Sequence, residues 1–391
     1  MLFFLNSLAF SDLGKYCQAP RKSFSFPDDK KLLHVSVLIR HGHRTPEKPQ
    51  LPMSARGHWE CDDANAPAPR SEGGPSKFYR YYDQILDPEM IDYPPSCRAG
   101  DLTIVGQQMH IDLGAAYRKF LVDEKHFLPQ KMDPALFDFY TSPIERTFRS
   151  AESFIDGLYP PLSDNEVLTI ISGTAAAAPL NPSETNCEQM KVERDAFLAS
   201  DDYKNLVTGI WPDIKDATQQ YFHVMEPTVD GVHLICGWAV AFNCSVGSQV
   251  PVFMDDKFMN ACRKENRYSQ WGLFAYLSNH SVAGAPIYRH ILKVAEDGMK
   301  SGKKFALQSA HDTTLAAFLT YLGVPQEDVT PYASHVAITF WEDNSQNKYI
   351  KISLNGNDLI MPGFEGSPYV EYSQFRAKYN QFQDFCPEIA V

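Results

Sequence analysis

"VLIRHGHRTPEKP", residues 37–49, joins an apolar run to a cluster of basic side chains. The apolar part is typical of a buried strand. Four arginine and histidine side chains follow it at once: Arg40, His41, His43 and Arg44. So much positive potential at a strand end is not needed by a folded core, and it favours an anion-binding site.

The composition is that of a globular protein. The chain has 391 residues, of which 44% are hydrophobic and 21% charged, enough for one large domain with an insertion or for two domains. The net charge of −12 disfavours nucleic acid as a partner. In such an acidic chain, a local cluster of arginines is a stronger indication of an anion-binding site. No segment beyond the N-terminal region is apolar and long enough to predict a membrane span.

The eight cysteines are dispersed and form no C-x-x-C pair, which disfavours a zinc knuckle. Their even number is typical of disulfides in an oxidising compartment, although buried free thiols are the alternative. Four bridges allow 105 pairings, among which the sequence cannot choose. Two N-glycosylation sequons, at Asn243 and Asn279, agree with secretion. We therefore expect a disulfide-bonded glycoprotein that is secreted or resides in a lysosomal or vacuolar lumen.

Apolar runs alternate with helical patterns along much of the chain. Runs that predict buried strands lie at 32–39, 136–142, 167–173 and 303–310. Two further runs near the end, "HVAITFWED" and "KYIKISLNG", predict a hairpin at a sheet edge. The alternation indicates a layered α/β fold with a largely parallel central sheet and helices on both faces.

The expected domains follow from this pattern. Residues 1–27 would be an N-terminal arm or a remnant leader, and 28–178 with 296–391 the α/β core. Residues 179–295 would form an inserted, mostly helical lobe. Residues 47–98, rich in proline and glycine, predict a long irregular insertion, and such loops often serve as lids or binding loops.

Charged residues follow three of the predicted strands. Arg40 to Arg44 follow the first strand, Arg146 lies in the first turn of the helix after the second, and His311 and Asp312 follow the fourth. Ligands of open α/β sheets bind beyond the carboxyl ends of the strands. If these strands are neighbours, the residues meet in one pocket.

That set of residues suits phosphoryl transfer. Guanidinium groups donate paired hydrogen bonds to phosphate oxygens and stay charged at any working pH. A neutral histidine among arginines has a lowered pKa and can attack phosphorus, giving a phosphohistidine that water hydrolyses. An aspartic acid can protonate the departing alkoxide. Gly42 is expected to permit a tight turn and to leave room for phosphate near His41.

The segment "RHGHRTP" resembles the R-H-G-x-R-x-P signature of the histidine acid phosphatases, branch 2 of the histidine phosphatase superfamily. Three more segments resemble that family in the same order: "GDLTIVGQQMHIDLG", its G-x-L-T-x-x-G helix; "YTSPIERTFRSAESF", its mid-chain arginine segment; and "LQSAHDTTLAAFLTYLG", its late His-Asp motif. The likeness runs from about residue 32 to 356 and is weak in 47–98 and 179–295.

The resemblance implies a role for each matching residue. His41 is similar to the nucleophile and Asp312 to the proton donor. The residues similar to the phosphate cradle are Arg40, Arg44, Arg146 and His311. We expect neither a cofactor nor a metal. Family members are often dimers, so a homodimer is possible. The mutase branch usually takes its acid from a glutamate, and the His311–Asp312 pair therefore favours a phosphatase.

Two residues are weaker candidates for substrate binding. Lys48 lies where some phytases place a substrate-contacting lysine. His43 occupies the variable position of the motif, where it either tunes the nucleophile or faces solvent. His34 and His110 fall within strand and helix patterns, which favours structural roles.

The sequence thus predicts an acid phosphatase that hydrolyses small phosphate monoesters. More specialised members of the family, acting on lysophosphatidate, phytate or sugar phosphates, are the first alternative, and "EKPQLP" resembles the lysophosphatidate and phosphoxylose phosphatases. A metal-dependent phosphatase is the second alternative, with four ligands: His41, His43, His311 and Asp312. A non-catalytic anion-binding protein is the third.

Overall fold

The structure is a computed structural model, and it describes residues 17–27, 29–47, 70–71, 74–75, 81–84, 98–163, 166–174, 178–184, 187–245, 253–276, 281–381 and 386. Within these ranges, no helix has the length and hydropathy needed to cross a membrane.

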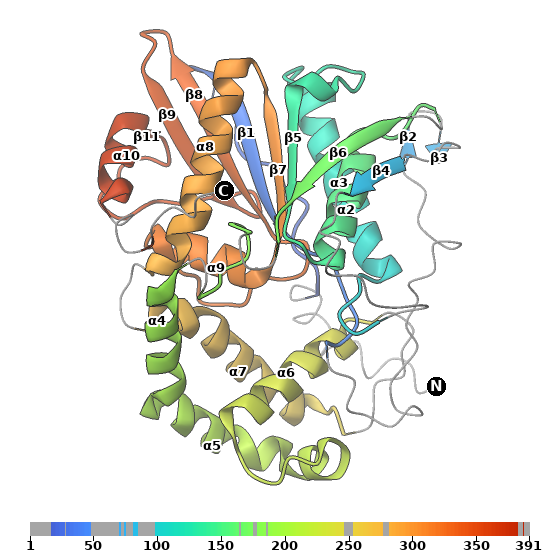
Figure 1. Ribbon diagram of the computed structural model, residues 1–391, viewed down its shortest axis with the longest axis vertical. Coiled ribbons are helices and arrows are strands. Elements are labelled where there is room, and N and C mark those ends of the chain that lie inside the picture. The colour runs from blue at the N-terminus through green and yellow to red at the C-terminus, as the bar shows by residue number, and fades with distance from the viewer. Residues whose placement is uncertain are drawn as a thin grey trace.

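A central sheet orders its strands β10-β9-β8-β1-β7-β5-β6-β4, with β11 paired to β9 (Figure 1). The parallel part consists of β1 (Lys30–Arg40), β7 (Phe305–Ala310), β5 (Phe137–Thr141), β6 (Val167–Ser172) and β4 (Tyr81–Gln84). The antiparallel part consists of β8 (His335–Asp343), β9 (Lys348–Leu354), β10 (Asn357–Asp358) and β11 (Val370–Glu371). A separate ribbon pairs β2 (Arg70–Ser71) with β3 (Gly74–Pro75).

The largely parallel sheet and its late antiparallel hairpin, β8–β9, confirm the predicted fold class. Strand β1 is buried without interruption from His34 to Arg40, as a parallel strand covered on both faces must be. Residues 47–98, expected to be a long irregular insertion, contain the ribbon β2–β3 and the strand β4, which pairs with β6.

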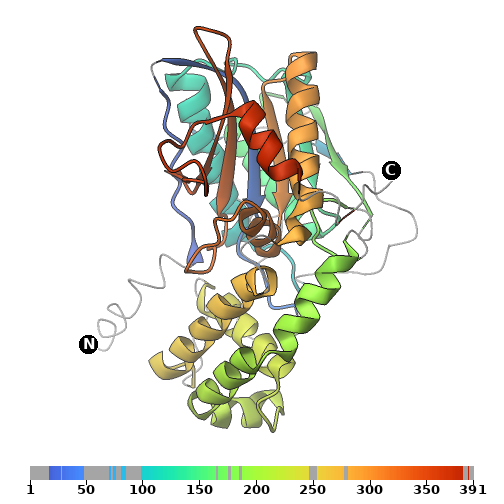
Figure 2. The same ribbon diagram turned by 90° about the vertical axis from the view of Figure 1, so that its left-hand side faces the viewer.

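Helices cover both faces of the sheet (Figure 2). One face carries α2 (Ile104–Arg118), its π-helical continuation η3 (Lys119–Glu124), and α3 (Glu145–Leu158). The other carries α8 (Ala285–Ser301), α9 (Asp312–Tyr321) and α10 (Tyr372–Asn380). Each face has its own apolar core, one around Phe154 and Trp341 and the other around Tyr288 and Leu315.

Four main helices from the residues expected to form an inserted lobe lie beyond one end of the sheet, and we call them the lobe (Figure 1). They are α4 (Glu188–Ala199), α5 (Asp201–Ala217) with its continuation η5 (Thr218–Phe222), α6 (Val229–Asn243) and α7 (Asp256–Ala275). Short 3-10 turns, η4 (Pro134–Leu136) and η6 (Val282–Gly284), lie outside the lobe. An apolar cluster that includes Phe197, Trp238 and Phe258 holds the lobe together. The domain limits remain predictions, and α8 packs against β1 and β7.

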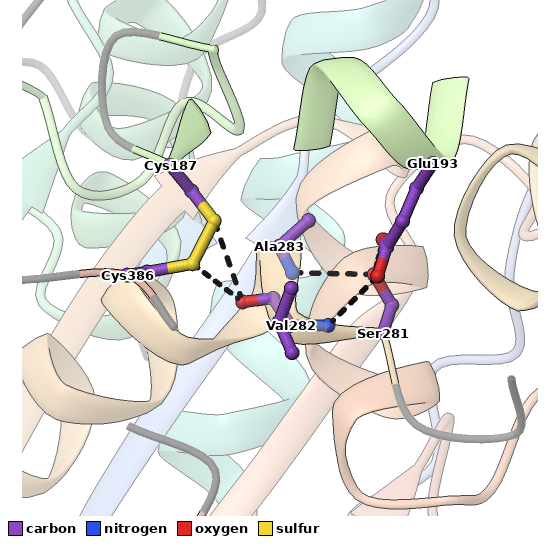
Figure 3. The surroundings of a disulfide bond; sticks show 6 residues. All are labelled: Cys187, Glu193, Ser281, Val282, Ala283 and Cys386. Atoms are coloured by element: carbon purple, nitrogen blue, oxygen red, sulfur yellow. Dashed lines mark hydrogen bonds between the residues drawn. A yellow bond between two sulfur atoms is a disulfide. The ribbon is translucent and has the colours of Figure 1, made fainter. Parts of the chain in front are cut away.

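Six of the cysteines are described, and all six form disulfides: Cys17–Cys244, Cys187–Cys386 and Cys236–Cys262. The first joins the segment before β1 to the end of α6, and the second joins the start of α4 to Cys386, which follows α10. The third joins α6 to α7. Beside the Cys187–Cys386 bridge, the buried Glu193 of α4 accepts the Ser281 hydroxyl at 2.6 Å (Figure 3). The predicted disulfides are thus confirmed for these cysteines, whereas Cys61 and Cys97 lie outside the described residues.

Candidate active site

The register of three neighbouring strands aligns the predicted catalytic segments. Arg40, the last residue of β1, pairs with Ala310 of β7, and Thr141 of β5 pairs with Ser309. The next residues along each strand, His41, His311 and Ser142, therefore emerge side by side at the carboxyl edge. Arg146 lies in the first turn of α3, as predicted. The three segments thus converge, as the sequence analysis required.

A cavity of about 360 Å³ lies between this edge of the sheet and the lobe. Its core side is lined by Arg40, Arg44, Glu47, Ile144, Arg146, His311, Asp312, Thr313, Val329 and Tyr332. Its lobe side is lined by His233, Gly237, Val240, Asn266, Ser269, Gln270 and Leu273, and Asn181 lies between the two. Five of the expected site residues therefore line one cavity.

His41 lies beneath this lining with 2% of its surface exposed. Its backbone N–H donates to the Ala310 carbonyl at 2.9 Å, which fixes the chain at the end of β1. Its ring Nδ1 lies 2.8 Å from the Gly42 carbonyl oxygen. Because a carbonyl only accepts, Nδ1 carries the hydrogen and Nε2 of the neutral ring keeps its lone pair.

The surroundings of His41 keep its ring neutral. Burial is the largest cause that lowers the pKa of His41 well below its ordinary value, followed by the charges of Arg146 and Arg40. The ring centroids of His41 and His311 are 5.7 Å apart. A buried imidazole surrounded by cations resists protonation, so the ring of His41 stays neutral in acid.

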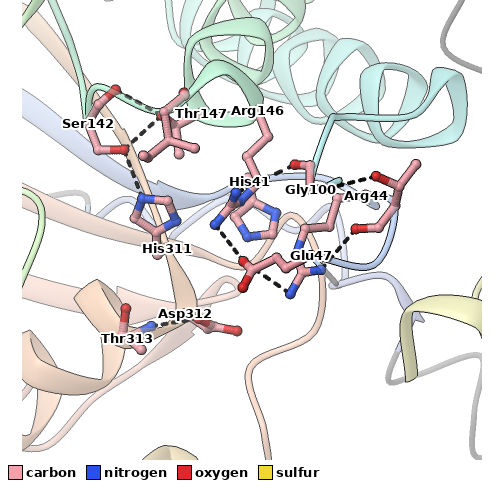
Figure 4. Close-up of polar contacts among 12 residues, drawn as sticks. His41, Arg44, Glu47, Gly100, Ser142, Arg146, Thr147, His311, Asp312 and Thr313 are labelled. Carbon is pink, nitrogen blue, oxygen red and sulfur yellow. Dashed lines mark hydrogen bonds and ion pairs between the residues drawn. The ribbon is translucent and has the colours of Figure 1, made fainter. Parts of the chain in front are cut away.

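Two arginines meet at one carboxylate (Figure 4). Glu47 Oε1 lies 2.9 Å from Arg146 Nη2 and 3.5 Å from Arg44 Nη2. Arg146 also approaches the Gly100 carbonyl at 3.5 Å through Nη1. Burial lowers the pKa of Arg146 to about 10, which leaves it charged at any acidic pH. The pair already binds an anionic group of this chain.

The third arginine faces the predicted proton donor. Arg40 Nη2 lies 2.7 Å from Asp312 Oδ2, and Arg40 Nη1 donates to the Thr330 carbonyl. Its guanidinium carbon lies 4.4 Å from the centroid of the Tyr332 ring, a cation–π contact. Arg40 is thereby held in place from three sides.

His311 and Asp312 open α9 next to this arginine. His311 Nε2 is 2.8 Å from the Ser142 hydroxyl, which also bonds to Thr147. Burial, and then the charge of Arg146, lower the pKa of His311 to about 3. His311 is the N-cap of the helix, and Asp312 Oδ1 accepts the Thr313 N–H at 2.8 Å.

Asp312 is ionised in the protein without phosphate. Burial raises the pKa of Asp312, but the charges of Arg40, Arg44 and His311 together outweigh it and hold that pKa below its ordinary value. A proton-donating role therefore requires that another anion first take up part of the arginine charge.

Gly42 is needed for a reason that the sequence analysis missed. Its φ is not in the left-handed region, so no special turn is involved. A Cβ on Gly42 would lie 2.3 Å from the Gly106 carbonyl oxygen, and a Cβ on Gly106 would lie 2.2 Å from the His43 carbonyl oxygen. The two glycines, one from each family-like motif, let the first turn of α2 pack against the loop that carries His41.

His43 does not reach the cavity, and the interpretation that it faces solvent was wrong. It is 1% exposed, with Nδ1 2.7 Å from the Thr103 hydroxyl and Nε2 2.9 Å from the Ala241 carbonyl. Burial lowers the pKa of His43 to about 4. The side chain links the N-cap of α2 to α6 of the lobe, and nothing places it against substrate. Lys48 lies outside the described residues.

Three residues of the site escaped the sequence analysis: Ser142, Glu47 and Tyr332. Ser142 is the last residue of the predicted strand 136–142 and directly follows β5, so its position at a strand end was a usable signal. Glu47 gave none, because a carboxylate three residues after Arg44 is ordinary in a loop. Tyr332 precedes β8, and only the antiparallel pairing of β8 with β1 brings it to the end of β1.

Within the described ranges, no cluster of three or more histidine, cysteine or acidic side chains has the geometry of a metal site. The four ligands proposed for the metal-dependent alternative do not converge, because His43 points toward Thr103 and Ala241.

The fold and this arrangement define an α/β protein with an arginine-lined cavity above a buried, neutral histidine. Residues 31–355 match the histidine phosphatase superfamily (branch 2), and the chain belongs to this family. The resemblance stated from the sequence is thereby confirmed.

The named relatives described next match most of the length of this chain. It is 25% identical to counting factor 60 of Dictyostelium discoideum over 375 residues, 90% of this chain and 86% of that protein. It is 23% identical to a probable acid phosphatase of the same organism, over 85% of this chain and 70% of that protein. It is 24% identical to lysophosphatidic acid phosphatase type 6 of Mus musculus, over 86% and 82%. The relatives named phosphatases confirm the enzyme class, a hydrolase of phosphate monoesters.

The structure is similar to that of the Hafnia alvei phytase in its apo form, with a TM-score of 0.63 and 15% sequence identity. The match covers 93% of this chain and 99% of the phytase. At this identity the likeness shows the fold alone.

Proposed function

We propose that this acid phosphatase hydrolyses small phosphate monoesters through a phosphohistidine on His41, with Asp312 as the proton donor. One observation carries the proposal. His41 Nδ1 donates to the Gly42 carbonyl, which leaves the Nε2 lone pair on a ring surrounded by three arginines. Nucleophilic attack needs that lone pair, and the arginines supply the charge that a phosphoryl group requires.

The phosphate takes the place of the Glu47 carboxylate. One oxygen of that carboxylate, Oε1, already contacts both Arg44 and Arg146, so the two guanidinium groups lie close enough together to bind a single anion. Arg40 and His311 complete the cradle. Planar guanidinium groups also favour the phosphoryl group as its charge spreads over the equatorial oxygens in the transition state.

The reaction proceeds in two steps. First, Nε2 of His41 forms a bond to phosphorus, the ester P–O bond breaks, and the leaving oxygen takes the proton of Asp312. Second, water attacks phosphorus, gives its proton to the Asp312 carboxylate, and the P–N bond breaks. His41 is restored, Asp312 is again protonated, and inorganic phosphate leaves.

The charges around Asp312 and His41 explain why acidic pH favours the reaction. Asp312 is ionised while Arg40 and Arg44 face it alone, and a bound phosphate dianion offsets that charge and raises the pKa of Asp312. The lowered pKa of His41 keeps its ring neutral at the pH where Asp312 gains its proton. Nucleophile and acid are thus in their working forms together.

Several finer expectations remain part of this proposal. Lysophosphatidate, phytate and sugar phosphates are candidate substrates, and a relative named lysophosphatidic acid phosphatase supports considering the first. Three disulfides support a secreted, lysosomal or vacuolar location, since such bonds persist in oxidising compartments. Glycosylation at Asn243 and Asn279 and a homodimer also remain predictions.

Trapping the intermediate tests the proposal. The enzyme is mixed with 4-nitrophenyl phosphate, quenched in base because phosphohistidine is labile in acid, and digested for mass spectrometry. We expect phosphate on the peptide that contains His41 and none on the same peptide of the His41→Ala variant. Vanadate should inhibit turnover, and a chelator should not. Turnover lost to a chelator and restored by zinc or iron would instead support the metal-dependent alternative.

A further inference from the structure

A buried carboxylate lies in the lobe behind the cavity. Glu265 of α7 has a side chain that is 0% exposed. Its Oε1 accepts a hydrogen bond from the Tyr203 hydroxyl at 2.6 Å and another from His233 Nδ1 at 2.9 Å. Its Oε2 has no hydrogen-bond partner in the part of the chain that the structure describes. The charge of Glu265 is therefore compensated through one oxygen only.

His233 is the cation that this carboxylate requires. An ionised carboxylate out of water is costly unless it is paired, and His233 forms the ion pair recorded for Glu265 among the described residues. The charge of Glu265 is the largest cause that raises the pKa of His233. The histidine is thus held as an imidazolium in acid.

The position of His233 makes its charge available to a ligand. Its side chain is 58% exposed, and it lines the same cavity as His311 and Asp312. Nδ1 is used by Glu265, whereas no hydrogen bond of Nε2 is found within the described ranges. An imidazolium donates from both ring nitrogens, so Nε2–H is an unused donor on a side chain that lines the cavity.

The acidic groups around His233 leave its charge available to a ligand. Those that act on it are Glu265 of α7, Asp230 of its own helix and Asp312 of α9, with the Tyr203 hydroxyl of α5 behind Glu265. Asp312 is paired with Arg40 at 2.7 Å, and Glu265 is buried behind the histidine. An anion that enters the cavity therefore meets His233 on the side opposite the Arg44–Arg146 pair.

We propose that His233, held by Glu265, is a second anion-binding position of the cavity, and that preferred substrates carry a further phosphate or carboxylate on the leaving group. This inference rests on the proposed function. The second anion belongs to the leaving group because Asp312, which protonates the leaving oxygen, is the catalytic side chain whose charge reaches His233. Organic bisphosphates and phosphorylated carboxylic acids are the chemical classes that fit.

A matched series of substrates tests the proposal. Alkanediol bisphosphates of two to six carbons are compared with the hydroxyalkyl monophosphates of equal length, by phosphate release at pH 5. Two equivalent ends alone give a bisphosphate a twofold advantage in kcat/KM. For the best chain length we expect about fivefold beyond that, the size of a solvent-accessible ion pair.

Substitution of His233 separates charge from shape. His233→Asn keeps a donor for Glu265 and removes the cation, so the ratio of bisphosphate to monophosphate should fall to about the statistical value. His233→Lys should keep the preference and extend it to neutral pH. The control is His223→Asn, an exposed lobe histidine outside the cavity lining, which should leave the ratio unchanged. If the ratio survives in His233→Asn, the inference is wrong.

Glu265→Gln tests the positioning role by a pH profile. Without the carboxylate, the pKa of His233 falls, and the bisphosphate preference should disappear at a lower pH than in the wild type. A purely structural Glu265 would instead lower both activities in parallel without moving that midpoint.

Failure of the proposed function would look different. In that case the wild type would not hydrolyse 4-nitrophenyl phosphate at all. Calorimetry with the His41→Ala protein would then still compare the affinities of the bisphosphate and the monophosphate. An affinity ratio near the statistical value of two there, or a wild-type kcat/KM ratio near two at every chain length, would overturn the second anion position by itself.

Discussion

The two walls of the cavity are built in different ways. The core wall places its side chains one residue beyond adjacent strand ends, and the main chain and buried hydroxyls hold them. The lobe wall presents its side chains from the faces of α6 and α7, with His233 as its cation. Their histidines differ as well, since burial lowers the pKa of His311 and an ion pair raises the pKa of His233. The difference suggests that the sheet carries the chemistry and the lobe the selectivity.

The largest expected effect falls on the core wall. His41→Ala should lower kcat by roughly 10⁴-fold or more, because no other group of the site replaces the nucleophile. Phosphate release from 4-nitrophenyl phosphate measures this, and an unchanged melting temperature shows that the variant is folded. Near-wild-type turnover would contradict the assignment of the chemistry to the core wall of the cavity.

Asp312→Asn should show the leaving-group dependence of a proton donor. Hydrolysis of alkyl phosphates should fall by roughly 10²- to 10⁴-fold, whereas 4-nitrophenyl phosphate, whose leaving group barely needs a proton, should lose much less. The comparison of kcat for the two esters is the measurement. Equal losses would mean that Asp312 only positions Arg40.

Arg146→Lys keeps the charge and loses the planar fork. Because hydrogen bonds to charged groups contribute about 1.5 to 3 kcal/mol, kcat/KM should fall roughly 10- to 100-fold. The matched control is Arg149→Lys, one turn further along α3, where the arginine pairs with Glu145 at 2.7 Å. If the control loses as much activity as the Arg146 variant, the cradle has been assigned to the wrong arginine.

Buried histidines of the core should make the fold less stable in acid. Burial lowers the pKa of His34 to about 4 and that of His110 to about 3. Between the ordinary value near 6.5 and these values, the unfolded chain binds protons that the folded chain does not. The free energy of unfolding should therefore fall as pH drops, by up to about 1.4 kcal/mol per pH unit and histidine.

Urea unfolding at pH 7, 6, 5 and 4 measures this slope, and His34→Gln should flatten it by up to one proton. An unchanged slope in that variant would mean that His34 titrates normally in the folded chain. His233, with its raised pKa, acts in the opposite direction.

The smallest effect concerns the carboxylate between two arginines. Glu47→Gln should lower the KM for monoesters and the inhibition constant for inorganic phosphate by a few-fold, because an internal competitor is weakened. The effect stays small because Glu47 is 52% exposed and its ion pairs are screened by solvent. A higher KM would show that Glu47 orients the arginines rather than competing for them.

The residues of the core wall were easier to predict from the sequence than those of the lobe wall. Arg40, His41, Arg146 and His311 were predictable because parallel strands place their carboxyl ends at one edge, and strand-to-helix patterns mark those ends. Tyr332 was not predictable, because it depends on an antiparallel strand whose partner the sequence does not name.

The lobe was less accessible for a physical reason. Whether a helical residue faces a cavity or a core depends on how that helix packs, and α6 packs on both the lobe and the core. His43 illustrates this, since its partners come from Thr103 and from Ala241, 198 residues away. No local pattern distinguishes such a buried histidine from a substrate ligand.

The contact between Gly42 and Gly106 gives the enzyme an unusual vulnerability. A single methyl group at either position would act as a wedge between the loop that carries His41 and the first turn of α2. An inactivating mutation can thus leave every charged group of the site intact. A variant of this kind would keep all of the proposed catalytic residues and still lack activity. A prediction from those residues alone would wrongly identify it as an active enzyme.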